Sequence, residues 1–518
     1  MTRGADVRLA ELVASLSLAT DLGLGLPEEH VLRQTVIASR LARLAAIDEA
    51  TTFYVSLLAW VGCIADSHEL AHWFGDDRAI RADSYQVDKV GLPMMRLMLG
   101  HLGAGSHPLH RVSVIGRFLS GGFREAIDGF IAHCQTTGDI AERLGLHPHV
   151  RGALGQAFER WDGKGVPGKA HGDGIAPAMR VVQIADDAEV FARLAGPAAA
   201  LAMLQERKGT EFDPHLVDLV TEDLLADLDV VDAWKVVIDG CAGLDRSIPP
   251  DELDDVLTVF ADYADLKSPW YVGHSRAVGD LARRAAEMAG CPPDEVALVG
   301  RAGLVHRLGA TGVSTGIWNK ATPLTPSETE RVRQVPYLTE RILCRQPLLA
   351  RIGAVAAMCH ERVDGSGYPR GTSGAALPRA GRLLAAADHY QSLSEDRPDR
   401  PALPATERRA VCLAEVRDGR LDADAVDAVL AVAGHRVGRR RTLVAGLTAR
   451  EADVLQQLVR GRSNREIAGQ LGISPRTVGA HIEHIFTKTG VSTRGAAVMF
   501  ALRHGLVTAD GTSVDHPM

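Results

Sequence analysis

One short segment, ADSHELAHWFGDD at residues 65–77, combines residue types that bind metal ions. His68 and His72 are four residues apart, so on a helix their imidazoles would face the same way and could ligate one ion. Asp66, Asp76 and Asp77 place carboxylates nearby. Side chains at this spacing also line solvated helix faces or cap helices, so metal binding and a structural role both stay open.

Two glycine-rich loops stand out, GKGVP at residues 163–167 and GSGYP at residues 365–369. Their glycines permit positive φ angles, which predicts tight turns. A phosphate-binding P-loop would follow a strand, precede a helix and end in Lys-Ser or Lys-Thr, and neither loop does so. We therefore expect turns.

Both loops belong to an internal repeat. Residues 159–186 align without gaps to residues 361–388 at a constant offset of 202, with 11 of 28 positions identical. Each copy has apolar residues at steps of three and four, which predicts helices. We expect two helical domains, a first copy at 1–225 and a second copy at 245–434.

The C-terminal segment predicts four short helices between residues 447 and 505. Thr448 with Glu451 and Ser463 with Glu466 have the spacing of capping boxes, and Gly472 is placed to end the second helix. Ser474 and Pro475 then begin a third helix, whose apolar positions are Val478, Ile482, Ile485 and Phe486. Two helices joined by a glycine-containing turn, the second beginning with polar and basic residues, predict a helix-turn-helix.

The stretch from LTAREADVLQQLV to FALRHGLV, residues 447–507, resembles the LuxR-type DNA-binding domain along its whole length. The resemblance implies phosphate contacts from Arg476, Thr477 and Lys488. It also implies that four residues contact the bases or lie beside them: Val478, Gly479, Ala480 and Glu483. Relatives often have lysines where this chain has Gly479 and Glu483, so a helical bundle that does not bind DNA is the alternative. Family members often dimerise through the last helix, here at Ala497, Val498 and Ala501.

The second copy resembles the HD-GYP phosphohydrolase family. The matching motifs are GHSRAVGDLARRA, LVHRLGA, NKATPLTPSETERV, CHERVDGSGYP and AAAD. Active members hydrolyse cyclic di-GMP at a centre of two or three iron or manganese ions. The resemblance implies metal ligands at His274, His306, His360 and Asp388. It implies ligand contacts at Lys320, Gly367, Tyr368 and Pro369.

Four positions depart from the family's pattern. Arg307 replaces the metal-bridging Asp, and Ala310, Val335 and Cys359 replace a Lys and two His. Arginine has no acceptor atom and keeps its charge, so it opposes a cation. We therefore expect no catalysis. The four remaining ligands would hold one transition-metal ion, or none if they are satisfied core groups with Arg307 paired to Asp388.

The first copy departs further from the pattern. Ala59 and Trp60 occupy the place of the His-Asp pair, and Ala157 and Phe158 occupy the place of the paired histidines. Retained polar residues are His30, His133 and Asp186. Two aromatic side chains would fill the former metal cavity, leaving either a packed core or an apolar ligand pocket.

The composition suits a soluble globular protein, with 46% hydrophobic and 24% charged residues and a net charge of −8. Residues 435–510 contain twelve Arg and Lys against five acidic residues. This C-terminal segment is therefore the part of the chain whose charge favours binding to a polyanion. The N-terminal segment predicts an amphipathic helix and not a signal peptide. The seven cysteines form no Cys-x-x-Cys pair, which indicates free thiols in a reducing cytoplasm.

These observations predict a mainly α protein. Two degenerate HD-type domains would be followed by a basic linker at 435–446 and a four-helix LuxR-type domain at 447–510. The expected function is a cytoplasmic, homodimeric transcription regulator that binds double-stranded DNA and a small-molecule or nucleotide ligand, without a membrane. The alternative is a metal-dependent cyclic-dinucleotide phosphodiesterase with a DNA-binding output domain.

Overall fold

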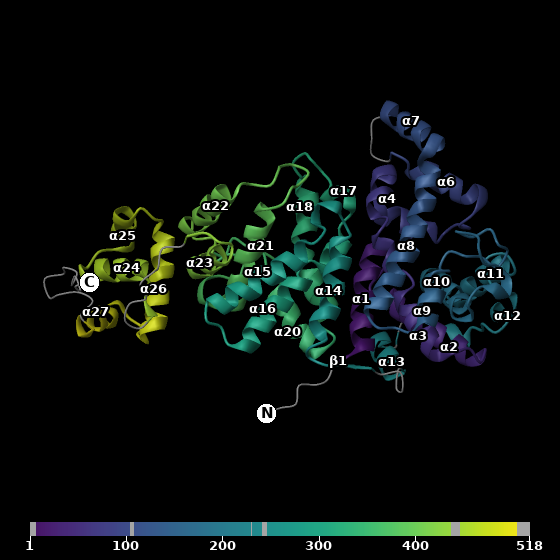
Figure 1. Cartoon of the computed structure of the whole chain (residues 1–518), viewed down its shortest axis with the longest axis horizontal. Helices are drawn as coiled ribbons and strands as arrows, with labels where there is room; N and C mark the ends of the chain where they lie inside the picture. Colours follow the sequence, from purple (N-terminus) through teal and green to yellow (C-terminus); the bar gives the residue numbers. More distant parts are fainter. Residues whose placement is uncertain are drawn as a thin grey trace. The chain divides into compact units, whose positions relative to one another are not determined.

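The computed structural model describes residues 7–103, 108–228, 230, 232–240, 246–436 and 446–504. The described chain is mainly helical, as the sequence predicts (Figure 1). Two short strands, β1 (Val7–Arg8) and β2 (Ser247–Ile248), pair in antiparallel register with Val7 opposite Ile248.

Among the described residues up to 240, which include the first copy, there are thirteen α-helices and four shorter helical turns. They are α1 (Leu9–Leu24), α2 (His30–Leu44), α3 (Glu49–Leu58), η1 (Val61–Ile64), α4 (Ser67–Phe74), α5 (Asp77–Ser84), α6 (Gly91–His101), α7 (Pro108–Arg117), η2 (Phe118–Gly122), α8 (Phe123–Arg143), α9 (Pro148–Leu154), η3 (Gly172–Gly174), α10 (Pro177–Ala195), α11 (Pro197–Arg207), α12 (Pro214–Val217), η4 (Asp223–Leu225) and α13 (Ala233–Gly240).

The region of the second copy is also helical. Its elements are α14 (Leu253–Asp265), η5 (Pro269–Tyr271), α15 (His274–Met288), α16 (Pro293–Val305), η6 (Leu308–Gly312), α17 (Thr315–Trp318), α18 (Pro326–Arg333), α19 (Val335–Leu343), α20 (Pro347–Ala356), η7 (Gly374–Ala376), α21 (Arg379–Leu393), α22 (Ala405–Arg417) and α23 (Ala423–Val432). The C-terminal segment adds α24 (Ala449–Val459), α25 (Asn464–Leu471), α26 (Pro475–Thr489) and α27 (Arg494–Arg503).

The chain divides into two compact units, each interleaved in sequence. The first unit contains residues 1–276, 304–354 and 396–401, and the second contains 277–303, 355–395 and 402–518. The domain bounds expected from the sequence remain a prediction. Most of the linker at 435–446, the segment 505–510 and Cys241 lie outside the described residues.

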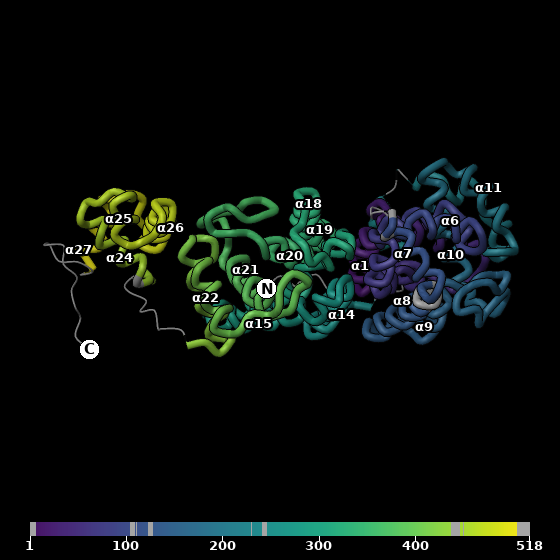
Figure 2. Tube along the Cα trace, turned by 90° about the horizontal axis from the view of Figure 1, so that it is seen from above, coloured from purple at the N-terminus to yellow at the C-terminus, as the bar shows by residue number. Residues whose placement is uncertain are grey.

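The first unit is organised around α1. This helix is buried on all sides and not amphipathic as expected, because α2, α3, η6 and α19 of the same unit pack around it. Three hydroxyl groups of this helix form hydrogen bonds within it. Ser15, Ser17 and Thr20 donate to backbone carbonyls three or four residues earlier. Farther along the chain, α9 packs beside α8 and α3 (Figures 1 and 2).

The helix-turn-helix in the second unit forms as its local signals predict. Both capping boxes are present, Gly472 ends α25 at a φ of 64°, and Ser474 caps α26 by accepting a hydrogen bond from the Thr477 amide. The four helices close over one apolar core, which includes Leu447, Val454, Leu455, Leu458, Ile467, Val478, Ile482, Ile485, Ala497 and Ala501.

The two glycine-rich loops have matching backbones, which agrees with the sequence repeat. Each contains a cis peptide before its proline, at Pro167 and Pro369. A Cβ added at Gly165 or Gly367 would lie within 2.6 Å of three backbone atoms, so only glycine fits there. A buried glutamate accepts backbone amides beyond each loop, Glu159 in the first copy and Glu361 in the second.

Among the described helices, none is long and apolar enough by itself to cross a membrane. One pair bent by 53°, Glu49–Ile64 with Ser67–Phe74, passes on length and composition. The six described cysteines are free thiols: Cys63, Cys134, Cys291, Cys344, Cys359 and Cys412.

Candidate functional site

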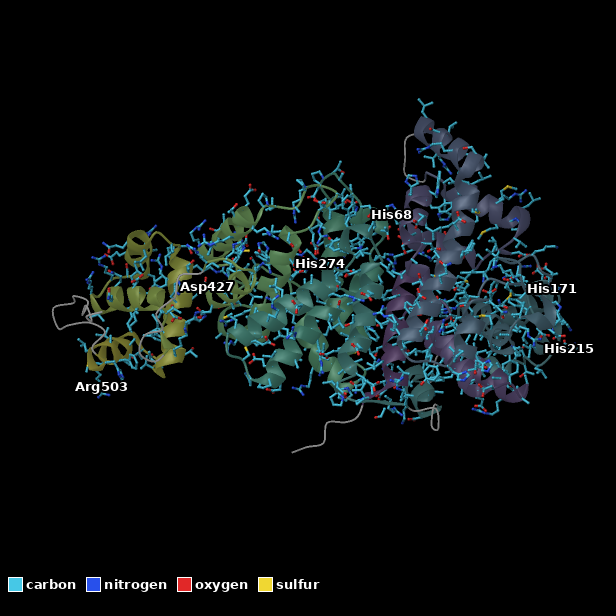
Figure 3. The ribbon with its side chains drawn as sticks, in the orientation of Figure 1. His68, His171, His215, His274, Asp427 and Arg503 are labelled. Carbon is cyan, nitrogen blue, oxygen red and sulfur yellow. The ribbon has the colours of Figure 1, made fainter. Side chains whose placement is uncertain are left out.

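In the first unit, two arginines and two histidines gather around Tyr271. His274, labelled in Figure 3, begins α15, and its ring centroid lies 5.6 Å from that of Tyr271 and 5.5 Å from that of His306. The guanidinium carbon of Arg307 lies 3.5 Å from the centre of the Tyr271 ring, and that of Arg397 lies 3.9 Å from it. Two fixed positive charges therefore stand beside the two histidines.

Arg307 is buried and its ion pair is with Asp265, not with Asp388 as expected. Its Nε lies 3.7 Å from a carboxylate oxygen of Asp265, whose two oxygens also accept hydrogen bonds from the amide and hydroxyl of Ser275. Burial raises the pKa of Asp265, while the charge of Arg307 opposes that rise. The pairing with Asp265 arises because η6, which follows Arg307, packs against α14, which ends at Asp265; sequence spacing alone does not reveal this contact.

Two positions that depart from the pattern of the HD-GYP family, Ala310 and Val335, belong to an apolar cluster. Ala310 and Val335 pack with Val313, Ile317 and Trp318, and the Tyr271 ring packs against the same group. Trp318 also faces the guanidinium of Arg307 at 5.0 Å. Arg307 is thus held between aromatic rings, next to a packed apolar cluster.

The other two predicted ligands lie in the second unit. His360 Nδ1 is 3.6 Å from a carboxylate oxygen of Asp388, and the ring of Tyr368 lies 4.9 Å from that of His360. Cys359, which directly precedes His360 in the sequence, is also buried. His274, His306 and Asp388 are all buried and are side chains of a kind that can ligate a metal, so this part of the ligand set is retained. The Arg307 cation does not fit a dinuclear metal centre at the histidine pair.

The residues predicted to contact a ligand have structural roles that do not depend on a ligand. Lys320 Nζ donates to Glu328 at 2.7 Å, within the first unit. Gly367 is required by backbone crowding, and the amide of Tyr368 donates to the His360 carbonyl. A ligand role for Lys320, Gly367, Tyr368 and Pro369 remains a prediction.

The first copy brings together His30 and Asp186, but as an ion pair. His30 Nε2 is 3.0 Å from Asp186, and its Nδ1 is 2.5 Å from Glu189. Burial lowers the pKa of His30, but attraction to Glu189 and the bonds to both carboxylates outweigh it and raise the pKa to about 10. A protonated imidazole with both nitrogens occupied has no lone pair for a metal.

His133 lies apart from that pair, among aromatic rings. Its Nε2 is 2.9 Å from the Ala59 carbonyl, and its ring lies 4.7 Å from Phe158 and 6.4 Å from Trp60. Burial lowers the pKa of His133 to about 4, so it is neutral at physiological pH. Trp60 and Phe158 line a cavity of about 220 Å³.

The segment 65–77 forms ion pairs instead of a metal cluster. Asp66 pairs with Arg81, and Asp77 pairs with Arg81 at 3.2 Å and with buried Lys267 at 2.6 Å. Burial would raise the pKa of Asp77, but Lys267 and Arg81 lower it to about 2. His68 Nδ1, labelled in Figure 3, is 2.9 Å from the side-chain nitrogen of Asn319. Asp66 and Asp77 are therefore committed to cations, whereas Asp76 caps α5 by accepting backbone amides.

The recognition helix α26 presents most of the predicted DNA contacts at the surface. Arg476 and Glu483 are exposed, and Thr477, Gly479 and Ala480 are half-buried. Val478 is the exception: its side chain is fully buried in the core and cannot reach DNA. Lys488 Nζ donates to Glu451 at 2.8 Å, so this predicted phosphate contact also ties α26 to α24.

Within the second unit, the start of α26 faces loops of the second copy. Arg476 donates to the carbonyl of Asp364, and a cavity of about 700 Å³ separates the two surfaces. Its lining includes Asp364, Asp418, Asp422 and Asp424 on one side and Arg476, Thr477, Gly479, Ala480 and Glu483 on the other. In this arrangement acidic loops lie opposite the face expected to read DNA.

The expected dimer contact on α27 is wrong for two of its three residues. Ala497 and Ala501 are fully buried in the core of the helix-turn-helix, so they are not available to a partner. Val498 is half-buried, and the exposed apolar residues of this helix are Met499 and Leu502.

Three residues at these sites were missed from the sequence. Glu189 lies one helical turn after Asp186 on α10, so helical spacing could have identified it. Asp265 and Arg397 are distant in sequence from Arg307 and His274, and no local pattern marks them.

Comparison with family models identifies two segments. Residues 258–425 match the HD domain model, and residues 445–501 match the model of bacterial regulatory proteins of the luxR family.

Several curated proteins are similar to this chain. The 3′3′-cGAMP-specific phosphodiesterase 3 of Vibrio cholerae is 27% identical over 414 residues, which cover 78% of this chain and 90% of that protein. A cyclic di-GMP phosphodiesterase of Thermotoga maritima is 33% identical over 30% of this chain and 42% of its own length. The transcriptional regulatory protein MctR of Rhizobium johnstonii is 43% identical over 12% of this chain and 30% of its own length.

A solved structure shares the fold. The crystal structure of a cyclic GMP-AMP-specific phosphodiesterase of V. cholerae matches with a TM-score of 0.58 at 23% identity. The match covers 84% of this chain and 99% of that one, so the likeness extends well beyond the HD segment.

Proposed function

From the premise that this chain carries an HD domain homologous to HD-GYP phosphodiesterases and ends in a luxR-family domain, we propose that it is a transcription regulator whose HD-type copies no longer hydrolyse phosphodiesters. The copies serve as sensory domains. The observation that carries the proposal is the position of Arg307, stacked on Tyr271 beside His274 and His306.

The chemistry of an HD-type centre needs metal ions to activate water against a phosphodiester. Arg307 brings a permanent positive charge to the place of the bridging carboxylate and offers no acceptor. Its stacking on Tyr271 and its pairing with Asp265 support a settled structural role for this arginine. The apolar packing of Val335 supports the same conclusion, because a further position that the resemblance assigns to a ligand carries no donor atom.

The first copy supports the proposal independently. Its histidine His30 is held between Asp186 and Glu189, and Trp60 and Phe158 take the other ligand positions. A His30 imidazole with both nitrogens bound to carboxylates, beside two aromatic side chains, does not supply the set of ligands that a dinuclear centre needs.

DNA binding is proposed for α26. The helix N-terminus and Arg476 would contact phosphates, while Gly479, Ala480 and Glu483 would lie at base edges. Because Arg476 contacts the Asp364 loop in the arrangement described, DNA binding would require that contact to open. A ligand of the sensory domains would act on this equilibrium, by binding more tightly either to the arrangement with the Arg476–Asp364 contact or to the one without it.

A second candidate function is a metal-dependent cyclic-dinucleotide phosphodiesterase with a DNA-binding tail. It is favoured by the names of the relatives, which act on 3′3′-cGAMP and cyclic di-GMP, and by the retention of His274, His306 and Asp388. Under this candidate Arg307 would have to leave its stacked position for metals to bind.

Metal content and turnover separate the two candidates. The purified full chain is analysed by elemental mass spectrometry and incubated with cyclic di-GMP and with 3′3′-cGAMP. We expect no turnover of either and no dinuclear complement of transition metal. About two transition-metal ions per chain together with hydrolysis would overturn the proposal and establish the phosphodiesterase.

A restored variant serves as the reciprocal test. Arg307→Asp, Val335→His and Cys359→His, made together, return three family ligands, and circular dichroism checks that the helices remain. We expect this variant to bind more metal than the unaltered chain. If both bind equal amounts of metal, Arg307 is not what prevents binding.

A further inference from the structure

The first copy contains a cavity of about 220 Å³ that no function above uses. It lies against Trp60, Ala157 and Phe158, the positions that the HD-GYP resemblance assigns to lost metal ligands. The sequence left a packed core and an apolar ligand pocket as alternatives for this place. A cavity of this size favours the pocket, because a native core leaves few voids larger than a water molecule.

Aromatic side chains are concentrated around this cavity. The whole chain has 24 Phe, Trp and Tyr residues among 518, and seven of them line it. They are Trp60, Trp73, Phe74, Tyr85, Phe130, Phe158 and Phe212. The rings of Phe130 and Phe158 lie 4.6 Å apart in an edge-to-face arrangement. Such surfaces favour a flat aromatic guest, because ring contacts add to the burial of apolar area.

The volume limits the size of the guest. An engineered protein cavity of roughly 150 Å³ lined by apolar side chains stays dry and holds benzene. Pockets for drug-sized ligands span roughly 300–1,000 Å³. A cavity of about 220 Å³ therefore suits two fused rings and is too small to enclose a cyclic dinucleotide.

The basic side chains in the wall already have partners. Arg81 pairs with Asp66 and Asp77, Lys89 donates to Asp187 at 2.9 Å, and Arg160 lies 3.0 Å from Asp88. The buried carboxylate of Asp186 is matched by His30 and accepts from the Tyr85 hydroxyl. An anionic guest would have to take a cation from one of these carboxylates, so the wall favours an uncharged molecule.

One polar wall group is available for a specific hydrogen bond. The side-chain nitrogen of Gln183 donates to the carbonyls of Ala157 and Glu159, at 3.1 and 2.7 Å. Only the amide nitrogen can make those two bonds, so the orientation of the amide is determined. Among the described residues none donates to the Gln183 Oε1 atom, which leaves an acceptor in the wall.

We propose that this cavity is a binding site for an uncharged, flat molecule of two fused rings that carries one N–H or O–H donor. The aromatic walls would hold the rings, and Gln183 would accept the hydrogen bond. The inference deepens the sensory role and rests on the proposed function for its biological meaning. Its test measures binding alone, so its failure is distinguishable from failure of the metal and turnover test.

Three probes test the chemistry on the unaltered full chain by isothermal titration calorimetry. Indole has the two rings and an N–H donor, benzofuran has an ether oxygen in place of that donor, and naphthalene-2-sulfonate adds a negative charge. We expect one indole per chain, binding about tenfold weaker for benzofuran because the Gln183 oxygen then lacks a partner, and no binding of the sulfonate. No heat with indole, equal affinity for benzofuran, or tight binding of the sulfonate would each overturn the proposal.

A matched pair of variants locates the binding. Ala157 is buried in the cavity wall, so Ala157→Leu fills part of the volume, whereas Ala195→Leu makes the same change at the exposed end of α10. We expect Ala157→Leu to weaken indole binding at least about tenfold and Ala195→Leu to leave it unchanged. Thermal melts confirm that both variants are folded. Equal binding by a folded Ala157→Leu variant would show that indole binds elsewhere.

Discussion

The guanidinium of Arg307 lies over the ring of Tyr271, with its central carbon 3.5 Å from the ring centroid. Arginine stacks well on aromatic faces because its planar cation is weakly hydrated and is attracted to the ring. The same residue is paired with Asp265 at 3.7 Å. A residue held on two sides in this way is part of the core, and it cannot vacate its position without leaving a buried carboxylate unmatched.

Removing the Arg307 cation should destabilise the first unit. Arg307→Met keeps most of the hydrocarbon but loses the stacking and the ion pair, so we expect the free energy of unfolding to fall by about 2–4 kcal/mol. Urea unfolding followed by circular dichroism measures the change. Arg307→Lys is the control, because it keeps the charge and loses the planar stacking. It should cost less than the methionine variant, and a larger loss for lysine would mean that charge contributes nothing here.

Stability should also depend on pH through His30. Its pKa is about 10 in the folded chain and 6.5 in the unfolded chain, so the protonated form is favoured by folding. The stabilisation is complete below pH 6.5 and is lost as the pH rises from 6.5 toward 10. We therefore expect His30→Gln to cost roughly a few kcal/mol near pH 6, and the difference from the unaltered chain to shrink by pH 10.

His133 provides a control for that pH dependence. Its pKa is lowered to about 4 in the folded chain and is 6.5 in the unfolded chain, so it is almost entirely neutral in both above about pH 7.5. The cost of His133→Gln should then stay constant between about pH 7.5 and 10, measured by urea unfolding at each pH. A cost of His30→Gln that is equally flat would rule out a protonated His30 in the folded state.

DNA affinity should respond to the charges on α26. Arg476→Ala should weaken binding to double-stranded DNA and reduce the slope of log K against log salt by about one, because one phosphate contact is lost. Glu483→Gln should strengthen binding, since it removes a negative charge that faces the polyanion. Fluorescence anisotropy with a pool of random duplexes measures both effects over a series of salt concentrations.

Arg503 is the matched control for Arg476. It is an exposed arginine of the same domain at the end of α27, labelled in Figure 3 and away from the recognition helix in sequence. Arg503→Ala removes the same charge and should change affinity less than Arg476→Ala. Equal losses for the two variants would indicate attraction to the domain's net charge without a specific contact by α26.

The sequence by itself determined the helix-turn-helix almost completely. Its capping pairs, such as Ser463 with Glu466, act between residues three apart, and Gly472 ends α25 through its own backbone freedom. The internal repeat was equally readable, because Gly165 and Gly367 satisfy a crowding that arises within one loop. The sequence was also enough to find an arginine at position 307, where the resemblance to the HD-GYP family implies an aspartate.

Only the tertiary structure decided the partners of the buried charges. Arg307 pairs with Asp265 and His30 with Glu189, and each pair is joined by packing between helices that are distant along the chain. The same holds for the cavity beside Trp60 and Phe158, whose volume depends on how several helices fit together. Local signals set where helices begin and end because their interactions lie within one turn. Which charges meet, and which space stays empty, depends on contacts that no local pattern records.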